Sequence, residues 1–104
     1  MTYTLRFLPE VEDDVLVGYA WYEAKTRGLG EEFLRVFYVG VGDVSRNPLL
    51  YLMGHRDVRR RLLRRFPYTI YFRIEGREVI VLGLFHCARD PRTVRAKLWE
   101  RETP

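Results

Sequence analysis

The feature that most constrains the fold of this 104-residue chain is an uninterrupted apolar run at residues 79–85, with the sequence VIVLGLF. Successive side chains of a β-strand point to opposite faces of a sheet, so a strand without polar alternation is apolar on both faces. Such a strand is typical of a central position in a sheet that is covered on both sides. The run therefore predicts a central strand over residues 78–86.

Three other segments have the pattern of strands. Residues 2–8 and 68–75 alternate along their length, which predicts amphipathic, half-buried strands, and a short glycine-bearing turn at 75–77 closes a hairpin with the central strand. Residues 58–66 are a third candidate, but their arginines fall on both faces, so we expect a bulge or an edge position. These segments predict a three-stranded antiparallel meander after the first strand.

The segment between the first strand and the meander has helical periodicity. Residues 10–26 place apolar side chains on one face, and acidic residues occupy the first turn, where the helix dipole favours negative charge. A second helix begins at Glu31 and Glu32 and ends before Asn47 and Pro48, because proline disfavours the α region in its predecessor. We therefore expect a helical hairpin that packs on one face of the sheet.

Two glycines, Gly40 and Gly42, lie inside the second predicted helix. Each lowers the helix propensity by about 1 kcal/mol relative to alanine. Close contact with the other helix or with the sheet would explain their presence, so we expect both glycines at such contacts.

The composition limits the class of protein. With 47% hydrophobic and 31% charged residues, the chain has the profile of one globular domain, which excludes disorder and multi-domain enzymes. The single cysteine, Cys87, cannot form an internal disulfide, and no clustered Cys/His spacing occurs, so we expect no metal ion and no cofactor. The absence of a long apolar run and of a secretory signal favours a cytoplasmic protein without a membrane partner.

Charge is distributed unevenly along the chain. The net charge is +4, and all but two of the 18 basic residues are arginine, whose planar guanidinium suits phosphate and carboxylate groups. Five basic and eight acidic residues give residues 1–54 a net charge of −3, whereas 13 basic and six acidic residues give residues 55–104 a net charge of +7. The basic half indicates a polyanionic or acidic partner.

Seven short motifs follow one another along the chain. They are Trp21-Tyr22-Glu23, Gly28-Leu29-Gly30, Phe33, Asn47-Pro48, Arg61, Phe66-Pro67-Tyr68-Thr69-Ile70-Tyr71 and His86-Cys87-Ala88-Arg89-Asp90-Pro91. In this order, over residues 3–92, they resemble the RelE/ParE superfamily of bacterial toxins from type II toxin–antitoxin modules. The resemblance is greatest to its ParE-like, plasmid-stabilisation branch.

The resemblance implies an α+β fold with an N-terminal strand, a helical hairpin and a three-stranded antiparallel meander, in one RelE/ParE-like domain over residues 1–104. It implies a toxin that a co-encoded, largely acidic antitoxin holds inactive. ParE-like members inhibit DNA gyrase by binding, and we expect this function first. RelE-like members cleave mRNA on the ribosome without a metal, which is the alternative, and a non-catalytic basic nucleic-acid-binding domain is a further one.

Metal-free RNA cleavage needs a group that deprotonates the 2′-hydroxyl, a group that protonates the leaving oxygen, and cations around the phosphate. Arg61, Arg65 and Arg89 are the candidate cations, and His86 is the candidate proton carrier. The acid–base pair is incomplete, because residues 91–97 supply no recognisable second group of the kind that RelE-like enzymes place there. This gap favours inhibition by binding.

A surface that binds gyrase or nucleic acid would use cations and an exposed aromatic ring. The predicted target-binding residues are Arg59, Arg61, Arg64, Arg65, Tyr71, Arg73, Arg89 and Arg92. The arginines between 59 and 65 repel one another unless something pairs them, and the acidic first helix is one internal candidate, although we favour an external partner.

Three residues have a simple structural interpretation. His86 can hydrogen-bond the end of its strand instead of acting in chemistry, and His55, in a predicted loop, is expected to be solvated. Cys87 follows a buried strand, so we expect an inert core thiol.

Overall fold

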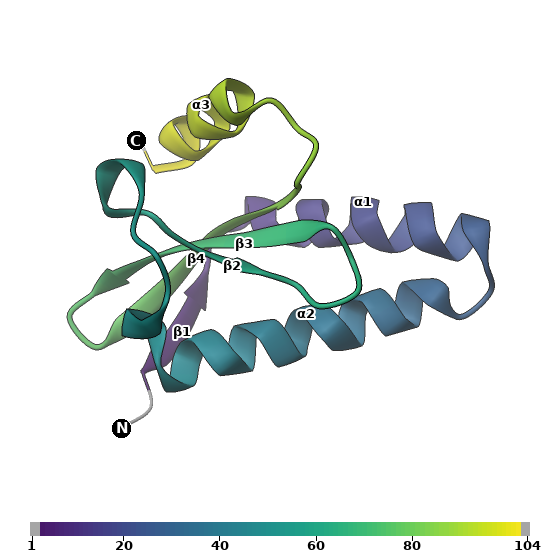
Figure 1. The fold of residues 1–104 in the computed structure, drawn as a ribbon, viewed down its shortest axis with the longest axis horizontal. Coiled ribbons are helices and arrows are strands. Elements are labelled where there is room, and N and C mark those ends of the chain that lie inside the picture. Colours follow the sequence, from purple (N-terminus) through teal and green to yellow (C-terminus); the bar gives the residue numbers. More distant parts are fainter. Residues whose placement is uncertain (1–2, 103–104) are drawn as a thin grey trace.

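The computed structural model describes residues 3–102, in which a four-stranded sheet lies between a helical hairpin and a C-terminal helix (Figure 1). The elements are, in chain order, β1 (Thr4–Phe7), α1 (Glu10–Lys25), α2 (Leu29–Arg46), the single-turn helices η1 (Pro48–Leu50) and η2 (His55–Asp57), β2 (Arg59–Leu62), β3 (Tyr68–Glu75), β4 (Glu78–His86) and α3 (Pro91–Glu102). β3 and β4 have the predicted bounds, whereas Thr2 of the first predicted strand lies outside the described residues. None of the described helices is long and apolar enough to cross a membrane.

β4 is an inner strand of the sheet, whose order is β1-β4-β3-β2. β3 pairs antiparallel with both β2 and β4, so the predicted meander is confirmed. β1 pairs parallel with β4, and the helical hairpin, β2 and β3 lie between these two strands in the chain. β2 is an edge strand, as predicted. The prediction of a half-buried first strand is wrong, since all of β1 is exposed at the other edge.

A bulge occurs in β4, while β2 satisfies the prediction of a bulge or an edge position by lying at the edge. Tyr71 pairs with Gly83 and the next residue, Phe72, pairs with Val81, so β4 carries one extra residue at this point. An extra residue exchanges the two faces of a strand. Val81 before the bulge and Leu84 after it therefore pack in the same core cluster, against the helical hairpin.

Two apolar clusters cover the two faces of β4, as the apolar run predicts. Val79 belongs to the cluster under the helical hairpin, which lies on one face as expected. On the other face, Ile80 and Leu82 pack against Val94 and Leu98 of α3. α3 was not expected, because Val94 and Leu98 are its only buried residues, and one turn of apolar pattern among charged residues is too short to recognise.

Close approach of α2 to the sheet explains Gly40 but not Gly42. A Cβ atom at Gly40 would lie 3.0 Å from Cδ1 of Ile70 and 3.1 Å from Cδ2 of Leu63, so the predicted contact is confirmed there. A Cβ atom at Gly42 would meet only Nη1 of Arg46, at 3.5 Å. The prediction of a close contact is therefore wrong for Gly42.

Replacement of Gly18 by alanine tests how closely the two helices of the hairpin pack. A Cβ atom at Gly18 would lie 2.5 Å from Cζ of Phe33, so the ring must move, and overpacking of this kind costs about 1–3 kcal/mol. We expect urea denaturation to give Gly18→Ala a lower free energy of unfolding than the wild type. Gly42→Ala, whose new methyl group would meet only the flexible side chain of Arg46 at an ordinary contact distance of 3.5 Å, gains up to about 1 kcal/mol from helix propensity. Equal stability of the two variants would contradict the packing described.

Candidate functional site

The predicted arginines of residues 58–66 separate to the two faces of the sheet. Arg61 points toward the helical hairpin, where it meets Asp43 of α2. Its neighbour Arg60 lies opposite Tyr71 of β3, whose ring packs with the apolar cluster under α3. Because successive side chains of β2 point to opposite faces of the sheet, Arg61 lies on the side of the helical hairpin and Arg60 on the side of α3.

Arg61 is held in a buried ion pair. Its side chain is 9% exposed, and Nη2 donates a hydrogen bond of 2.6 Å to Oδ2 of Asp43. Nη1 donates to the carbonyl of Leu62. The hydrogen bond from Arg61 holds the pKa of Asp43 below its usual range. Arg46 also pairs with this carboxylate, from the solvent side.

Other predicted cations are also paired within the chain. Nη1 of Arg65 lies 3.2 Å from a carboxylate oxygen of Glu32 on α2. Arg73 binds Glu102 of α3 through two hydrogen bonds, of 2.7 and 3.0 Å. These carboxylates belong to α2 and α3, so the acidic first helix does not neutralise this cluster.

The remaining predicted residues are more accessible. Arg59 donates to the carbonyl of Tyr51 at 2.7 Å, and the exposed Arg92 pairs with Asp90 at 3.1 Å. Arg64 is exposed and has no ion pair among the described residues.

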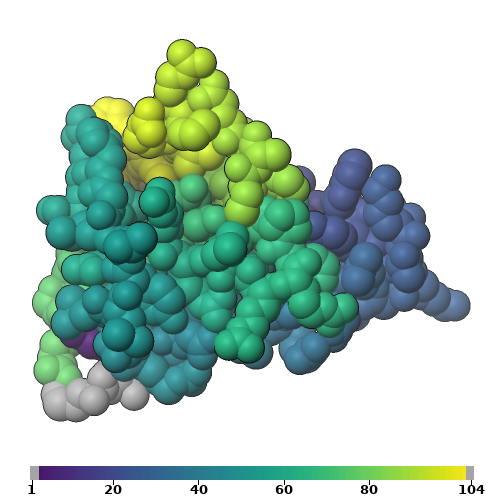
Figure 2. All heavy atoms as spheres, in the orientation of Figure 1, coloured from purple at the N-terminus to yellow at the C-terminus, as the bar shows by residue number. Residues whose placement is uncertain are grey.

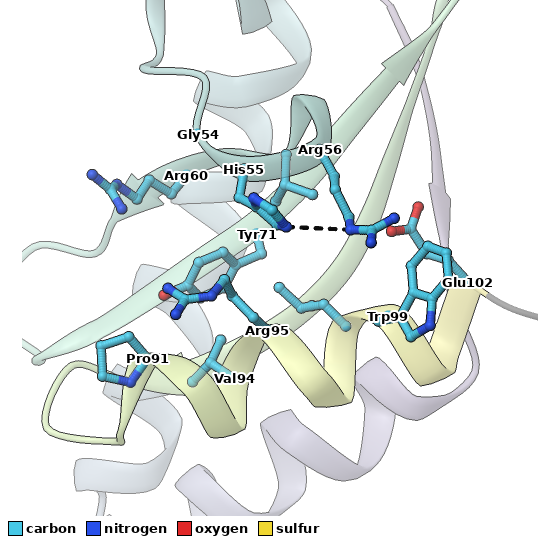
Figure 3. Close-up of a pocket in the computed structure, with 12 residues that line it drawn as sticks. Gly54, His55, Arg56, Arg60, Tyr71, Pro91, Val94, Arg95, Trp99 and Glu102 are labelled. Carbon is cyan, nitrogen blue, oxygen red and sulfur yellow. Dashed lines mark hydrogen bonds between the residues drawn. The ribbon is translucent and has the colours of Figure 1, made fainter.

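A cleft of about 130 Å³ lies between α3 and the sheet, and Figure 3 shows the side chains that line it. Three of them are cations, Arg56, Arg60 and Arg95, and two are the aromatic residues Tyr71 and Trp99. Burial raises the pKa of the Tyr71 phenol, so this group is a neutral hydrogen-bonding partner at neutral pH. We call this site the cationic cleft.

The backbone of η2 is strained where it forms one wall of the cationic cleft. Arg56 and Asp57 have φ angles of 58° and 63°, in the left-handed region that favours glycine. The guanidinium of Arg56 stacks 3.9 Å from the ring centre of Trp99, and its Nε donates to Nε2 of His55 at 3.2 Å. These contacts fix Arg56 at the cleft, although nothing in the local sequence of η2 indicates this role.

A second hollow, of about 340 Å³, lies at the end of β4. Its lining consists of Trp21 from α1, Tyr68 from β3, His86 from β4, and Ala88 and Arg89 from the loop that follows. We call it the strand-end hollow. It brings together two residues of the predicted catalytic set, His86 and Arg89, with the aromatic rings of Trp21 and Tyr68.

His86 is held in place by its neighbours. Its Nδ1 accepts a hydrogen bond of 2.9 Å from the backbone N–H of Ala88, and its ring makes an edge contact with Tyr68 at a centroid distance of 5.1 Å. Arg89 lies over the ring of Phe85, 5.3 Å from its centre. Cys87 is exposed, so the prediction of a core thiol is wrong, because the chain turns outward after His86.

The predicted ribonuclease set is not assembled in one place. Arg61 and Arg65 form ion pairs with α2, whereas His86 and Arg89 line the strand-end hollow. The hollow supplies one imidazole, one guanidinium and the phenol of Tyr68, and no carboxylate of residues 3–102 lines it. Among residues 3–102, no group of three His, Cys, Asp or Glu side chains could hold a metal ion. The two sites are suited to binding anionic or aromatic groups.

No protein-family model and no curated protein sequence matches the chain. Its fold matches solved structures. It is similar to a chain of the chromosomal ParDE toxin–antitoxin system from P. aeruginosa, with a TM-score of 0.69 and 20% identity, over 82% of this chain and 96% of that one. It is also similar to a chain of the toxin–antitoxin complex RelBE2 from Mycobacterium tuberculosis, with a TM-score of 0.56 and 24% identity, over 83% and 99%. The chain therefore has the RelE/ParE-like fold.

The ion pair between Arg61 and Asp43 is expected to stabilise the fold, and Asp43→Asn tests this. Loss of the carboxylate leaves a buried guanidinium without its charged partner, which costs about 1–3 kcal/mol of unfolding free energy. Arg46→Met is the control, because it removes the exposed partner of the same carboxylate and is expected to change stability by less than about 0.5 kcal/mol. Similar urea midpoints for the two variants would refute a structural role for Arg61.

Acid unfolding provides an independent test of the same pair. Because the folded-state pKa of Asp43 is lowered, its contribution to stability is present above the unfolded-state pKa and is lost as the pH falls through the folded value. We expect the stability difference between the wild type and Asp43→Asn to shrink as the pH falls from about 6 to 2. A difference that does not depend on pH would mean that ionisation of Asp43 contributes nothing.

Proposed function

We propose that this protein is the toxin of a type II toxin–antitoxin module and that it inhibits its target by binding, with DNA gyrase as the target. The observation that carries the proposal is the division of the predicted catalytic set. Arg61 and Arg65 are occupied in ion pairs, and the ionisable groups beside His86 in the strand-end hollow are the guanidinium of Arg89 and the phenol of Tyr68, whose pKa is raised by burial. Inhibition by binding needs no proton transfer, so it is compatible with this arrangement.

The fold supports the toxin assignment in general and a ParE-like function in particular. The TM-score is 0.69 against the ParDE chain and 0.56 against the RelBE2 chain. Both chains come from toxin–antitoxin systems or complexes, which supports a cognate antitoxin as the partner of this chain. Its excess of arginine favours an acidic antitoxin.

One observation favours a second candidate, a ribosome-dependent mRNA endonuclease. His86 and Arg89 line the same hollow as the rings of Trp21 and Tyr68, on which a nucleobase could stack. The imidazole of His86 would then have to share proton transfer with the phenol of Tyr68, whose pKa burial raises further from neutral pH. We rank this function second for that reason.

Two assays in parallel decide between these functions. We expect the purified protein to inhibit gyrase supercoiling and to leave ribosome-bound mRNA intact in a toeprint assay. His86→Ala is expected to inhibit gyrase as the wild type does, whereas loss of a general acid or base lowers a cleavage rate by about 10²–10⁴-fold.

Three results would count against inhibition by binding. Cuts in the ribosomal A site that disappear in His86→Ala would establish the endonuclease instead. Salt-sensitive affinity for duplex DNA without any growth defect on expression would indicate a simple nucleic-acid-binding domain. Full supercoiling activity at saturating protein concentration would exclude gyrase as the target.

A further inference from the structure

The cationic cleft carries positive charge that the fold leaves unbalanced. Its arginines come from three elements: Arg56 from η2, Arg60 from β2 and Arg95 from α3. All three are exposed, and none of them has an ion pair among the described residues. Glu102, the single carboxylate of the described residues that lines the cleft, already accepts two hydrogen bonds from Arg73. The cleft therefore attracts anions.

The wall that η2 contributes is held rigid by the chain itself. The N–H of Gly54 donates to the carbonyl of Val58 at 2.7 Å, and the N–H of Val58 donates to the carbonyl of His55 at 3.2 Å. Between these bonds, Arg56 and Asp57 keep their positive φ angles, which persist only where the surrounding structure imposes them. Strain of this kind clusters at ligand-binding sites, so it points to a function for this wall.

The floor of the cleft is apolar. Val94 and Leu98 of α3 are buried there, and Val58 and Tyr71 pack against the same cluster. An apolar floor excludes water from one side of a bound anion, which strengthens the attraction between the anion and the arginines.

The hydrogen-bond donors around the cleft suit a phosphate group better than a carboxylate. Figure 3 shows Arg95 extending from α3 toward Tyr71 of β3, and Arg60 directed outward at the mouth. Burial raises the pKa of the Tyr71 phenol, so its O–H remains a donor at neutral pH. Arg56 uses only its Nε on His55, which leaves its other N–H groups for a ligand. A phosphate group has more acceptor oxygens than a carboxylate, so it can bind more of these donors.

The size of the cleft limits the ligand to a small molecule. Its volume of about 130 Å³ is below the roughly 300–1,000 Å³ of pockets that enclose a whole drug-sized ligand, so it has room for one phosphate group and the atoms next to it. The teal segment that contains η2 and the yellow-green α3, which form two of its walls, lie at the top of the molecule in Figure 2. A nucleic-acid strand binds best to a row of cations along its successive phosphates, whereas these arginines line one cleft.

We propose that the cationic cleft binds a small molecule through a single phosphate group, which Arg56, Arg60 and Arg95 hold by charge-assisted hydrogen bonds. The phenol of Tyr71 donates a further hydrogen bond to the same group. Inorganic phosphate and a phosphate ester such as a nucleoside monophosphate share this chemistry. The site has no lining residue in common with the strand-end hollow, and it does not depend on the proposed function.

Trp99 provides a probe of the cleft, because the guanidinium of Arg56 stacks on its ring. Trp21 is the other tryptophan of the chain, so Trp21→Phe leaves Trp99 as the only indole. At constant ionic strength, we expect inorganic phosphate and adenosine monophosphate to change the fluorescence of Trp99 saturably, and acetate to bind at least about tenfold more weakly. Isothermal titration calorimetry of the wild type measures the same affinities. Tighter binding of the monophosphate supports an ester as the ligand, and equal affinity supports the free anion.

Two variants of α3 separate the cleft from the net charge of the protein. Arg95→Gln and Lys97→Gln each remove one positive charge from an exposed position of this helix, but only Arg95 lines the cleft. Glutamine is a good helix former, so we expect α3 to form in both variants. Arg95→Gln is expected to bind phosphate about tenfold more weakly than the wild type, whereas Lys97→Gln binds it as the wild type does.

Four results would overturn the phosphate site. One is the absence of any saturable heat or fluorescence change with both phosphate ligands, and another is acetate binding as tight as phosphate binding. Equal phosphate affinity in Arg95→Gln and Lys97→Gln would reduce the effect to net charge. Displacement of adenosine monophosphate by a single-stranded oligonucleotide without terminal phosphates, with an affinity that rises with its length, would assign the cleft to nucleic acid. None of these results depends on whether the protein inhibits gyrase.

Discussion

The rest of the structure depends on the burial of β4 on both faces, because the helical hairpin must pack on one face of the sheet and α3 on the other. An ion pair between α1 and α3 joins these two layers. Asp14 of α1 accepts hydrogen bonds of 2.7 and 2.8 Å from Arg101 of α3, and one of 3.0 Å from the backbone N–H of Leu84 in β4. Both side chains are only 11–12% exposed. Gly83 makes room for the pair, because a Cβ atom there would lie 2.7 Å from Nη1 of Arg101.

This two-sided arrangement determines which cations can meet a partner. Arginines that point toward the helical hairpin find carboxylates on α2, so Arg61 is held in an ion pair within the fold. Arginines on the α3 side, such as Arg60 and Arg95, line the cationic cleft with aromatic rings. Arg60 also lines a groove beside β2, together with Leu62 and Arg64. The net positive charge of the second half of the chain is therefore partly structural, and the share available to partners is concentrated around α3 and the β2 edge.

Much of this fold could be predicted from the sequence, because long periodic segments carry strong signals. The bounds of β3 and β4 and the helical hairpin follow from apolar periodicity and from glycine and proline positions. α3 could not be predicted, since it buries only two residues. The sequence predicted the residue types of the candidate sites but not which of them come together in space. Ion pairs such as that between Asp14 and Arg101 join residues 87 positions apart, so no local sequence pattern encodes them.

Hydrogen exchange of the amides of α3 tests most directly whether the ion pair between Asp14 and Arg101 holds α3 on β4. In Arg101→Met, we predict that these amides exchange at least about tenfold faster than in the wild type, while those of α2 exchange at the wild-type rate. Arg95→Met, which removes an α3 arginine for which no ion pair is found among the described residues, is predicted to leave both rates unchanged. Wild-type protection of α3 in Arg101→Met would contradict the account.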